Sequence, residues 1–135
     1  VHQFNVFTVN TPMQHGIARY MGDPAHYLQL PAFYQRKRDL FRDGLARTRL
    51  RVLPSEGSYF QCVGIADLAV PERSLPEAAF CEWLTSEIGV AAIPLSAFCD
   101  PGGPHFAQWN HLVRFAFCKR DDTLTEAIER LQALR

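Results

Sequence analysis

The sequence has no excess of charge of either sign, because 14 Lys and Arg side chains balance 14 Asp and Glu side chains in 135 residues. It also has no apolar run near the roughly 20 residues that a transmembrane helix needs, and its beginning does not have the form of a signal peptide. A neutral chain has no net field to attract nucleic acid or an anionic membrane surface. We therefore expect a cytoplasmic protein with no nucleic-acid partner and no membrane partner.

Cysteine and histidine are present but not grouped. Cys62, Cys81, Cys99 and Cys118 lie far apart, with no C-x-x-C pair and no His at ligand spacing, so we expect no metal site. The aliphatic surroundings of Cys62 and Cys118 predict reduced, buried thiols. A thiol or metal enzyme that uses Cys99 or His105 is an alternative, although no base lies at a spacing that suggests pairing.

Hydrophobic periodicity predicts an α+β fold, with helices packed on one face of a small, mainly antiparallel sheet. The expected helices cover residues 13–21, 24–45, 76–89 and 121–134, and the expected strands cover residues 49–53, 59–65, 90–93 and 112–118. Pro31 predicts a break near Gln29. The basic run at residues 36–38 is interrupted by Asp39 and predicts the solvated face of a helix, with a nucleic-acid patch as the alternative. Residues 96–109 form a Pro- and Gly-rich loop long enough to be functional.

Arg114 lies in the strand-like run of residues 111–117, between the apolar residues Val113 and Phe115. A buried guanidinium without a partner is costly, so an internal carboxylate or a ligand carboxylate or phosphate is expected beside it. Its planar fork grips a carboxylate through two parallel hydrogen bonds, which lysine cannot do. The alternative is that Arg114 lies on the wet face of a half-buried strand, since alternation places Val113 and Phe115 on the other face.

Three short strings occur in a fixed order: Glu56-Gly57-Ser58-Tyr59-Phe60 before a strand, residues 90–98 before a loop, and residues 113–117 before a helix. In this order the chain resembles the C-terminal part of the class I/II, fold-type I, pyridoxal-phosphate-dependent aminotransferases. It is most similar to the kynurenine and methionine aminotransferase branch, whose members carry a similar opening to residues 1–7 and 12–14.

The resemblance implies roles for individual residues. The arginine at the position of Arg114 binds the α-carboxylate of the substrate in such enzymes, Phe98 helps to shape the mouth of the site, and Tyr59 lies near its entrance. Phe7 matches an aromatic residue that reaches across a homodimer into the neighbouring subunit's site. The alternative for Phe98 and Tyr59 is that they are plain core aromatics. Residues 1–22 would be a lead-in from the end of a large domain, and residues 23–135 the small C-terminal domain.

The same resemblance implies pyridoxal 5'-phosphate in the full-length enzyme, bound covalently through a lysine. The chain contains only Lys37 and Lys119, and neither lies in the Ser-x-x-Lys context of the family. We therefore expect no catalytic residue, cofactor ligand or metal ligand in this chain, and no catalysis by the chain alone. The expected function is the carboxylate-binding part of an aminotransferase of amino acid metabolism, acting on an amino acid and a 2-oxo acid. The alternative is a free-standing α+β module that binds a small carboxylate or a protein partner.

Overall fold

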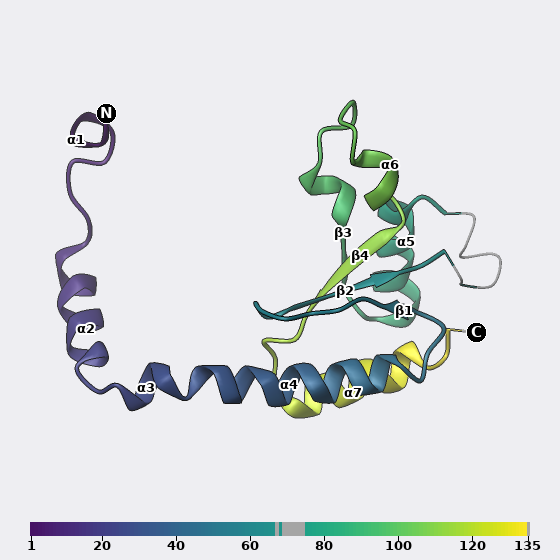
Figure 1. Cartoon of the computed structure of the whole chain (residues 1–135), viewed down its shortest axis with the longest axis horizontal. Coiled ribbons are helices and arrows are strands. Elements are labelled where there is room, and N and C mark those ends of the chain that lie inside the picture. The colour runs from purple at the N-terminus through teal and green to yellow at the C-terminus, as the bar shows by residue number, and fades with distance from the viewer. Residues whose placement is uncertain (67, 69–74, 135) are drawn as a thin grey trace. The chain divides into compact units, whose positions relative to one another are not determined.

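A computed structural model describes residues 1–66, 68 and 75–134 of the chain (Figure 1). Two compact units are present, Val1–Phe33 and Tyr34–Arg135, and each is described by itself. No helix of the described residues is long and apolar enough to cross a membrane. The domain boundary expected at residue 22 stays a prediction.

The first unit is helical and contains α1 (His2–Asn5), α2 (Thr11–Met21), α3 (Ala25–Leu28) and the beginning of α4 (Leu30–Leu45). Asn10 caps α2, because its side-chain oxygen accepts a hydrogen bond from the Met13 N–H at 3.1 Å. The helix expected at residues 13–21 is thus confirmed. It begins at Thr11, and its N-cap is Asn10. The break expected near Gln29 is also confirmed, since α3 ends at Leu28 and α4 begins at Leu30.

The second unit contains an antiparallel sheet whose strand order is β1-β2-β4-β3. The strands are short: β1 (Arg51–Val52), β2 (Phe60–Gly64), β3 (Ile93–Pro94) and β4 (Leu112–Ala116). Every pairing between them is antiparallel, and β1 and β2 form a hairpin. The α+β class is confirmed. Pro94 is tolerated in β3 because this strand lies at the edge of the sheet, where one side of the backbone needs no partner.

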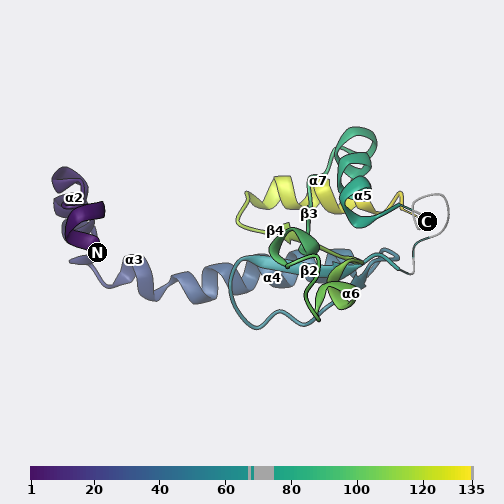
Figure 2. The same cartoon turned by 90° about the horizontal axis from the view of Figure 1, so that it is seen from above.

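One face of the sheet packs on helices α4, α5 (Glu77–Trp83) and α7 (Asp121–Leu131), whose buried residues share one core with Val63, Val113 and Phe115. The Phe115 ring meets the Phe41 ring of α4 edge to face, with centroids 5.8 Å apart. Figure 2 shows α5 and α7 on one side of the sheet and α6 (Phe106–Trp109) on the other. The π-helical turn η2 (Leu84–Ile88) follows α5 and ends at Gly89, whose φ of +74° suits a residue without a side chain.

The loop expected at residues 96–109 is only partly irregular, because it contains α6 and the last three residues of the 3-10 turn η3 (Leu95–Phe98). Its Pro-Gly-Gly-Pro segment, residues 101–104, remains outside these turns. Short helical turns of four residues carry too weak a periodic signal to be distinguished from a loop in the sequence.

The expectation that residues 36–38 form a solvated basic face is wrong for Lys37, which is buried. Its ammonium group donates hydrogen bonds to the Lys119 carbonyl at 2.6 Å and to the Asp121 carboxylate at 2.5 Å. The hydrogen bond and the charge of Lys37 lower the pKa of Asp121, with Arg36 adding a smaller attraction. Lys37 therefore connects α4 to the first turn of α7.

Candidate functional site

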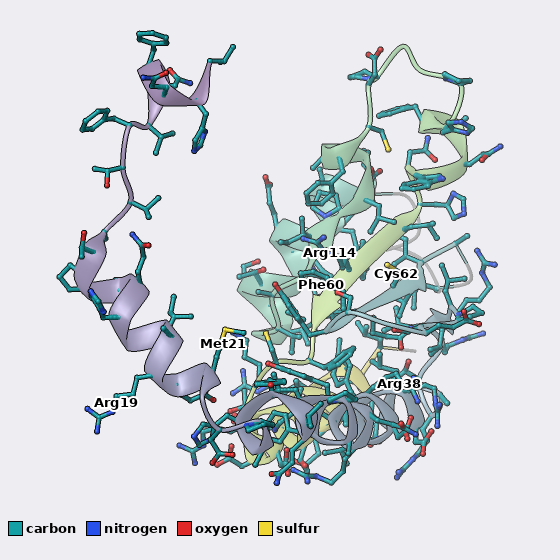
Figure 3. All side chains as sticks on the ribbon, turned by 60° about the vertical axis from the view of Figure 1, so that its left-hand side comes forward. Arg19, Met21, Arg38, Phe60, Cys62 and Arg114 are labelled. Atoms are coloured by element: carbon teal, nitrogen blue, oxygen red, sulfur yellow. The ribbon has the colours of Figure 1, made fainter. Side chains whose placement is uncertain are left out.

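Arg114 lies in the middle of β4, with Cys62 of β2 opposite it on one side and Ile93 of β3 on the other. Because its neighbours Val113 and Phe115 point into the helix-covered core, the alternation of the strand places Arg114 on the opposite face. Phe60 and Cys62 lie on this same face of β2, by the same alternation. Figure 3 shows the three labelled side chains gathered over the sheet.

The Arg114 guanidinium lies over two aromatic rings. Its central carbon lies 3.8 Å from the centroid of the Phe60 ring and 4.5 Å from that of Phe98. Each such contact with a desolvated cation is worth about 0.5–2 kcal/mol. The two rings hold the guanidinium plane and lower the cost of its partial burial.

A pocket of about 450 Å³ opens beside this guanidinium. Its walls are mostly apolar, and Glu56 and Arg114 are the charged residues among those that line it. The lining residues are Pro54, Ser55, Glu56, Gly57, Ser58, Phe60, Cys62, Leu95, Phe98, Trp109 and Arg114.

No carboxylate of the described residues forms an ion pair with Arg114. Its Nε atom is buried and has no hydrogen-bond partner within the described part of the chain. A half-buried cation without a carboxylate partner in the described residues is suited to bind an anion in the adjoining pocket. Arg114 is therefore not spread into bulk solvent, and no carboxylate of residues 1–66, 68 and 75–134 occupies it.

Cys62 shares the pocket with Arg114, and burial raises the pKa of its thiol, while the nearby Arg114 charge acts in the opposite direction. All four cysteines are free, and Cys62 is half-buried. The expectation that Cys118 is buried is wrong, because β4 ends at Ala116 and Cys118 lies in the exposed connection to α7.

Of the other predicted site residues, one lines the pocket and two do not. Phe98 is 60% exposed and lines the pocket, with its ring against Arg114. Tyr59 is 43% exposed and packs on Phe60 with ring centroids 4.4 Å apart, but it is not among the residues that line the pocket. Phe7 lies in the first unit, with a positive φ of 60° and 84% of its surface exposed.

Sequence reasoning assigned no role to Phe60 or Trp109, which also line the pocket. Phe60 could have been found, since pairing the two expected strands with like faces together brings Phe60 and Cys62 to the face of Arg114. Trp109 had no such signal, because its position depends on how η3 and α6 fold over the sheet.

Neither lysine of this chain fits a covalent bond to pyridoxal phosphate at this site. Lys37 is buried on the helix side of the sheet, with its ammonium group bound to a carbonyl and a carboxylate. Lys119 lines a separate cavity of about 250 Å³, whose floor includes Phe41 and Phe115. No group of three or more His, Cys, Asp and Glu side chains in the described residues could hold a metal ion.

The family model for class I and II aminotransferases matches residues 2–131. Together with a substrate-sized pocket around one unpaired arginine, this match establishes that the chain belongs to that family.

Individual relatives agree with this assignment. The chain is 45% identical over 135 residues to the methionine aminotransferase of Escherichia coli, covering 99% of this chain and 33% of the relative. It is 34% identical over 143 residues to kynurenine–oxoglutarate transaminase 3 of Rattus norvegicus, covering 96% of this chain and 31% of the relative.

Solved structures give the same result. The fold matches that of an E. coli methionine aminotransferase with a TM-score of 0.85 and 44% identity, over 99% of this chain and 33% of the other. It matches N-succinyldiaminopimelate aminotransferase of Mycobacterium tuberculosis with a TM-score of 0.83 and 39% identity, over 98% of this chain and 33% of the other. The chain thus spans about a third of the length of these relatives, and the third that it matches is C-terminal.

Proposed function

We propose that this chain is the carboxylate-binding part of a longer aminotransferase, which transfers an amino group between an amino acid and a 2-oxo acid. The observation that carries the proposal is the Arg114 guanidinium, which lines a pocket and has no carboxylate partner among the described residues. An amino acid and its 2-oxo acid share one anionic group, the carboxylate next to the reacting carbon. The planar fork of Arg114 suits that group.

The share of this chain in the reaction is to bind and orient. Arg114 binds the carboxylate of the substrate. This contact fixes the orientation of the adjacent carbon, where the reaction occurs, relative to the catalytic groups of the rest of the protein. Phe60 and Phe98 keep the guanidinium in place through their cation–π contacts and shield it in part from water. Pyridoxal phosphate, which the family implies for the full-length enzyme, supplies the carrier of the amino nitrogen. We propose that the part of the chain around Arg114 also moves to close the site over a bound substrate.

The substrate side chain is proposed to be sizeable and apolar, aromatic or sulfur-containing. Phe60, Leu95, Phe98 and Trp109 provide apolar walls, and the pocket lining has no second cation for a distal carboxylate. The similarity to methionine aminotransferase supports this side-chain class.

A homodimer is part of the same proposal, with Phe7 contributed to the site of the partner subunit and Tyr59 near the entrance. The exposure of Phe7 and of other large apolar side chains in the first unit supports a contact with protein outside this chain. The cytoplasmic location stays a prediction. A free-standing module that binds a carboxylate would use the same pocket, but membership of an enzyme family favours the first proposal.

The test uses the full-length enzyme, or a hybrid in which this chain replaces the matched C-terminal part of the E. coli methionine aminotransferase. Arg114→Ala should lower kcat/KM for methionine roughly 30- to 4,000-fold, about 2–5 kcal/mol of transition-state stabilisation. Arg114→Lys should recover only part of this loss, since an ammonium group cannot form two parallel bonds to one carboxylate.

Arg120→Ala is the matched control. Arg120 lies just before α7, is exposed, and forms an ion pair with Asp122. It should leave kcat/KM within about twofold of the parent, as expected for a surface ion pair. If Arg114→Ala were as active as Arg120→Ala, Arg114 would not bind the substrate and the proposed role would be wrong.

A further inference from the structure

One wall of the Arg114 pocket is a segment with no regular structure, residues 54–58, which joins β1 to β2 and is called the rim here. Most of its residues are exposed, and Ser58 adopts a positive φ of 65° without being glycine. Side chains at the rim limit what can enter beside Arg114. The position of the rim therefore depends on the hydrogen bonds that it forms with residues outside it.

A hydrogen bond reaches the rim from α4. The Arg38 Nη1 group donates to the Ser55 carbonyl at 3.1 Å, across 17 residues of sequence. Ser55 in turn donates from its hydroxyl to the Phe60 carbonyl at 3.1 Å. The rim is thus tied at one residue, Ser55, both to the helix and to the strand that carries the ring stacked on Arg114.

Asp39 holds the Arg38 side chain in this orientation. Its Oδ1 atom accepts from Arg38 Nε at 3.1 Å and from Arg38 Nη2 at 2.9 Å, which leaves Nη1 to reach Ser55. The Arg38 side chain is only 22% exposed, unlike that of Arg42, which is 45% exposed and also pairs with Asp39, at 3.1 Å. Because Asp39 balances its charge, Arg38 acts on the rim by geometry rather than by adding charge to the pocket.

We propose that Arg38 is a positioning residue for the carboxylate pocket: it holds the rim through Ser55, and so sets the affinity of the site for the substrate. This inference rests on the proposed function, in which Arg114 binds the substrate carboxylate. Arg38 lies on α4 outside the pocket lining (Figure 3) and touches no substrate in this role. A loosened rim weakens binding in the ground state and the transition state alike, so KM changes and kcat does not.

The test compares Arg38→Gln, Arg38→Lys and Arg42→Gln in the full-length enzyme or the hybrid, with methionine as amino donor. Arg38→Gln should raise KM about 3- to 30-fold with kcat within about twofold, because a shorter neutral side chain loses the bond to Ser55. Arg38→Lys should recover part of the change, since it can still donate to the carbonyl. Arg42→Gln should match the parent enzyme, because Arg42 shares Asp39 but is not bonded to the rim.

Ser55→Ala gives a second, independent variant that leaves α4 intact and removes the bond to the Phe60 carbonyl. It should also raise KM, and its effect should not add fully to that of Arg38→Gln, since both act through one residue. Thermal melting of each variant is recorded, and kinetics are measured well below the lowest Tm.

The inference is overturned if Arg38→Gln and Arg42→Gln have the same KM, if kcat falls while KM stays constant, or if the effects of Arg38→Gln and Ser55→Ala add in full. The proposed function fails separately, if Arg114→Ala leaves kcat/KM unchanged. A KM effect of Arg38→Gln in an enzyme that does not need Arg114 would also overturn the inference, because the rim would then act on another site.

Discussion

At the scale of single residues, Arg114 shows how a strand can carry a cation beside a core. The central carbon of the planar guanidinium lies over the faces of the Phe60 and Phe98 rings, whose negative quadrupoles attract its charge. A carboxylate binds at the edge of that plane, where the N–H groups point. Stacking and anion binding therefore do not compete, and the stacked rings reduce the rotamer freedom that binding would otherwise remove.

Cys62 offers a test of this arrangement in the 135-residue chain itself. Because burial raises the pKa of its thiol, the reactive thiolate fraction at pH 8 is smaller than for an ordinary cysteine. Iodoacetamide should therefore modify Cys62 more slowly than the exposed Cys118, and the Cys62 rate should still be rising above pH 9. Peptide mass spectrometry over a pH series measures both rates.

The carboxylate-bearing analogue iodoacetate adds the specific readout. Relative to iodoacetamide it should favour Cys62 over Cys118, because Arg114 attracts its carboxylate into the same pocket. Arg114→Gln should abolish that preference, and it should also raise the Cys62 pKa further, since the nearby positive charge is lost. Equal reagent preference at both cysteines in the parent chain would contradict carboxylate binding by Arg114.

At the scale of elements, α4 contacts three different parts of the second unit. Phe41 faces the core, Lys37 connects to α7, and Arg38 reaches the rim. Residues 37, 41, 44 and 45 recur at steps of three and four and form the buried stripe. Arg38 lies one residue, about 100°, around the helix from Lys37, which places it at the border of this stripe.

Gly44 sets how closely α4 and α7 approach. A Cβ atom at this position would lie 2.6 Å from Ile128 Cγ1, and Ile128 is buried in the core. Gly44→Ala should therefore destabilise the chain by about 1–3 kcal/mol, despite the better helix propensity of alanine. Urea unfolding followed by circular dichroism measures the change.

Gly16→Ala is the matched control, because Gly16 lies inside α2 and a Cβ there meets nothing within 4 Å. It should be neutral or stabilising by up to about 1 kcal/mol. Ile128→Val should relieve part of the Gly44→Ala cost by removing one methyl group from the overlap. If Gly44→Ala stabilised the chain as Gly16→Ala does, the helix contact would be looser than described.

The elements were predictable where one local rule decided them. Pro31 has no N–H to donate and lies in the first turn of α4, where the backbone needs no such donor, so the break at Gln29 followed from the sequence. The exposed Cys118 and the buried Lys37 were not predictable in this way. Cys118 depends on where β4 stops, and Lys37 depends on Lys119 and Asp121, which are more than 80 residues away in sequence.

At the scale of the whole molecule, the chain spans about a third of its relatives and exposes large apolar side chains in its first unit. Phe4, Phe7, Met13 and Ile17 are among these side chains. Exposed apolar residues in such number are suited to a contact with other protein. The proposed homodimer, in which Phe7 completes the partner's site, gives this surface a testable role.

Mixing two inactive variants of the full-length enzyme or the hybrid tests that role. Arg114→Ala removes the carboxylate ligand of its own subunit, and Phe7→Ala removes the aromatic residue given to the other subunit. In a mixed dimer, one site keeps both residues and the other loses both. Random reassociation of equal amounts should restore about a quarter of the parent activity, because half of the dimers are mixed and each has one intact site.

Subunits must be exchanged under mild denaturation and then assayed with methionine. The control is the Arg114→Ala variant alone, taken through the same denaturation and reassociation, and it should stay inactive. Activity that does not rise above the mean of the two separate variants would show that Phe7 does not act across a subunit contact.

The sequence by itself determined the longer helices, the α+β class and the resemblance to aminotransferases, because helix periods, strand alternation and turn residues act over a few neighbours. Only the tertiary structure decided that Arg114 has no carboxylate partner within the described chain, that Phe60 and Phe98 enclose it, and that Arg38 holds the rim of its pocket. These contacts join residues from β2, η3, β4 and α4. Distances between such segments follow from the packing of the whole core, which no local pattern encodes.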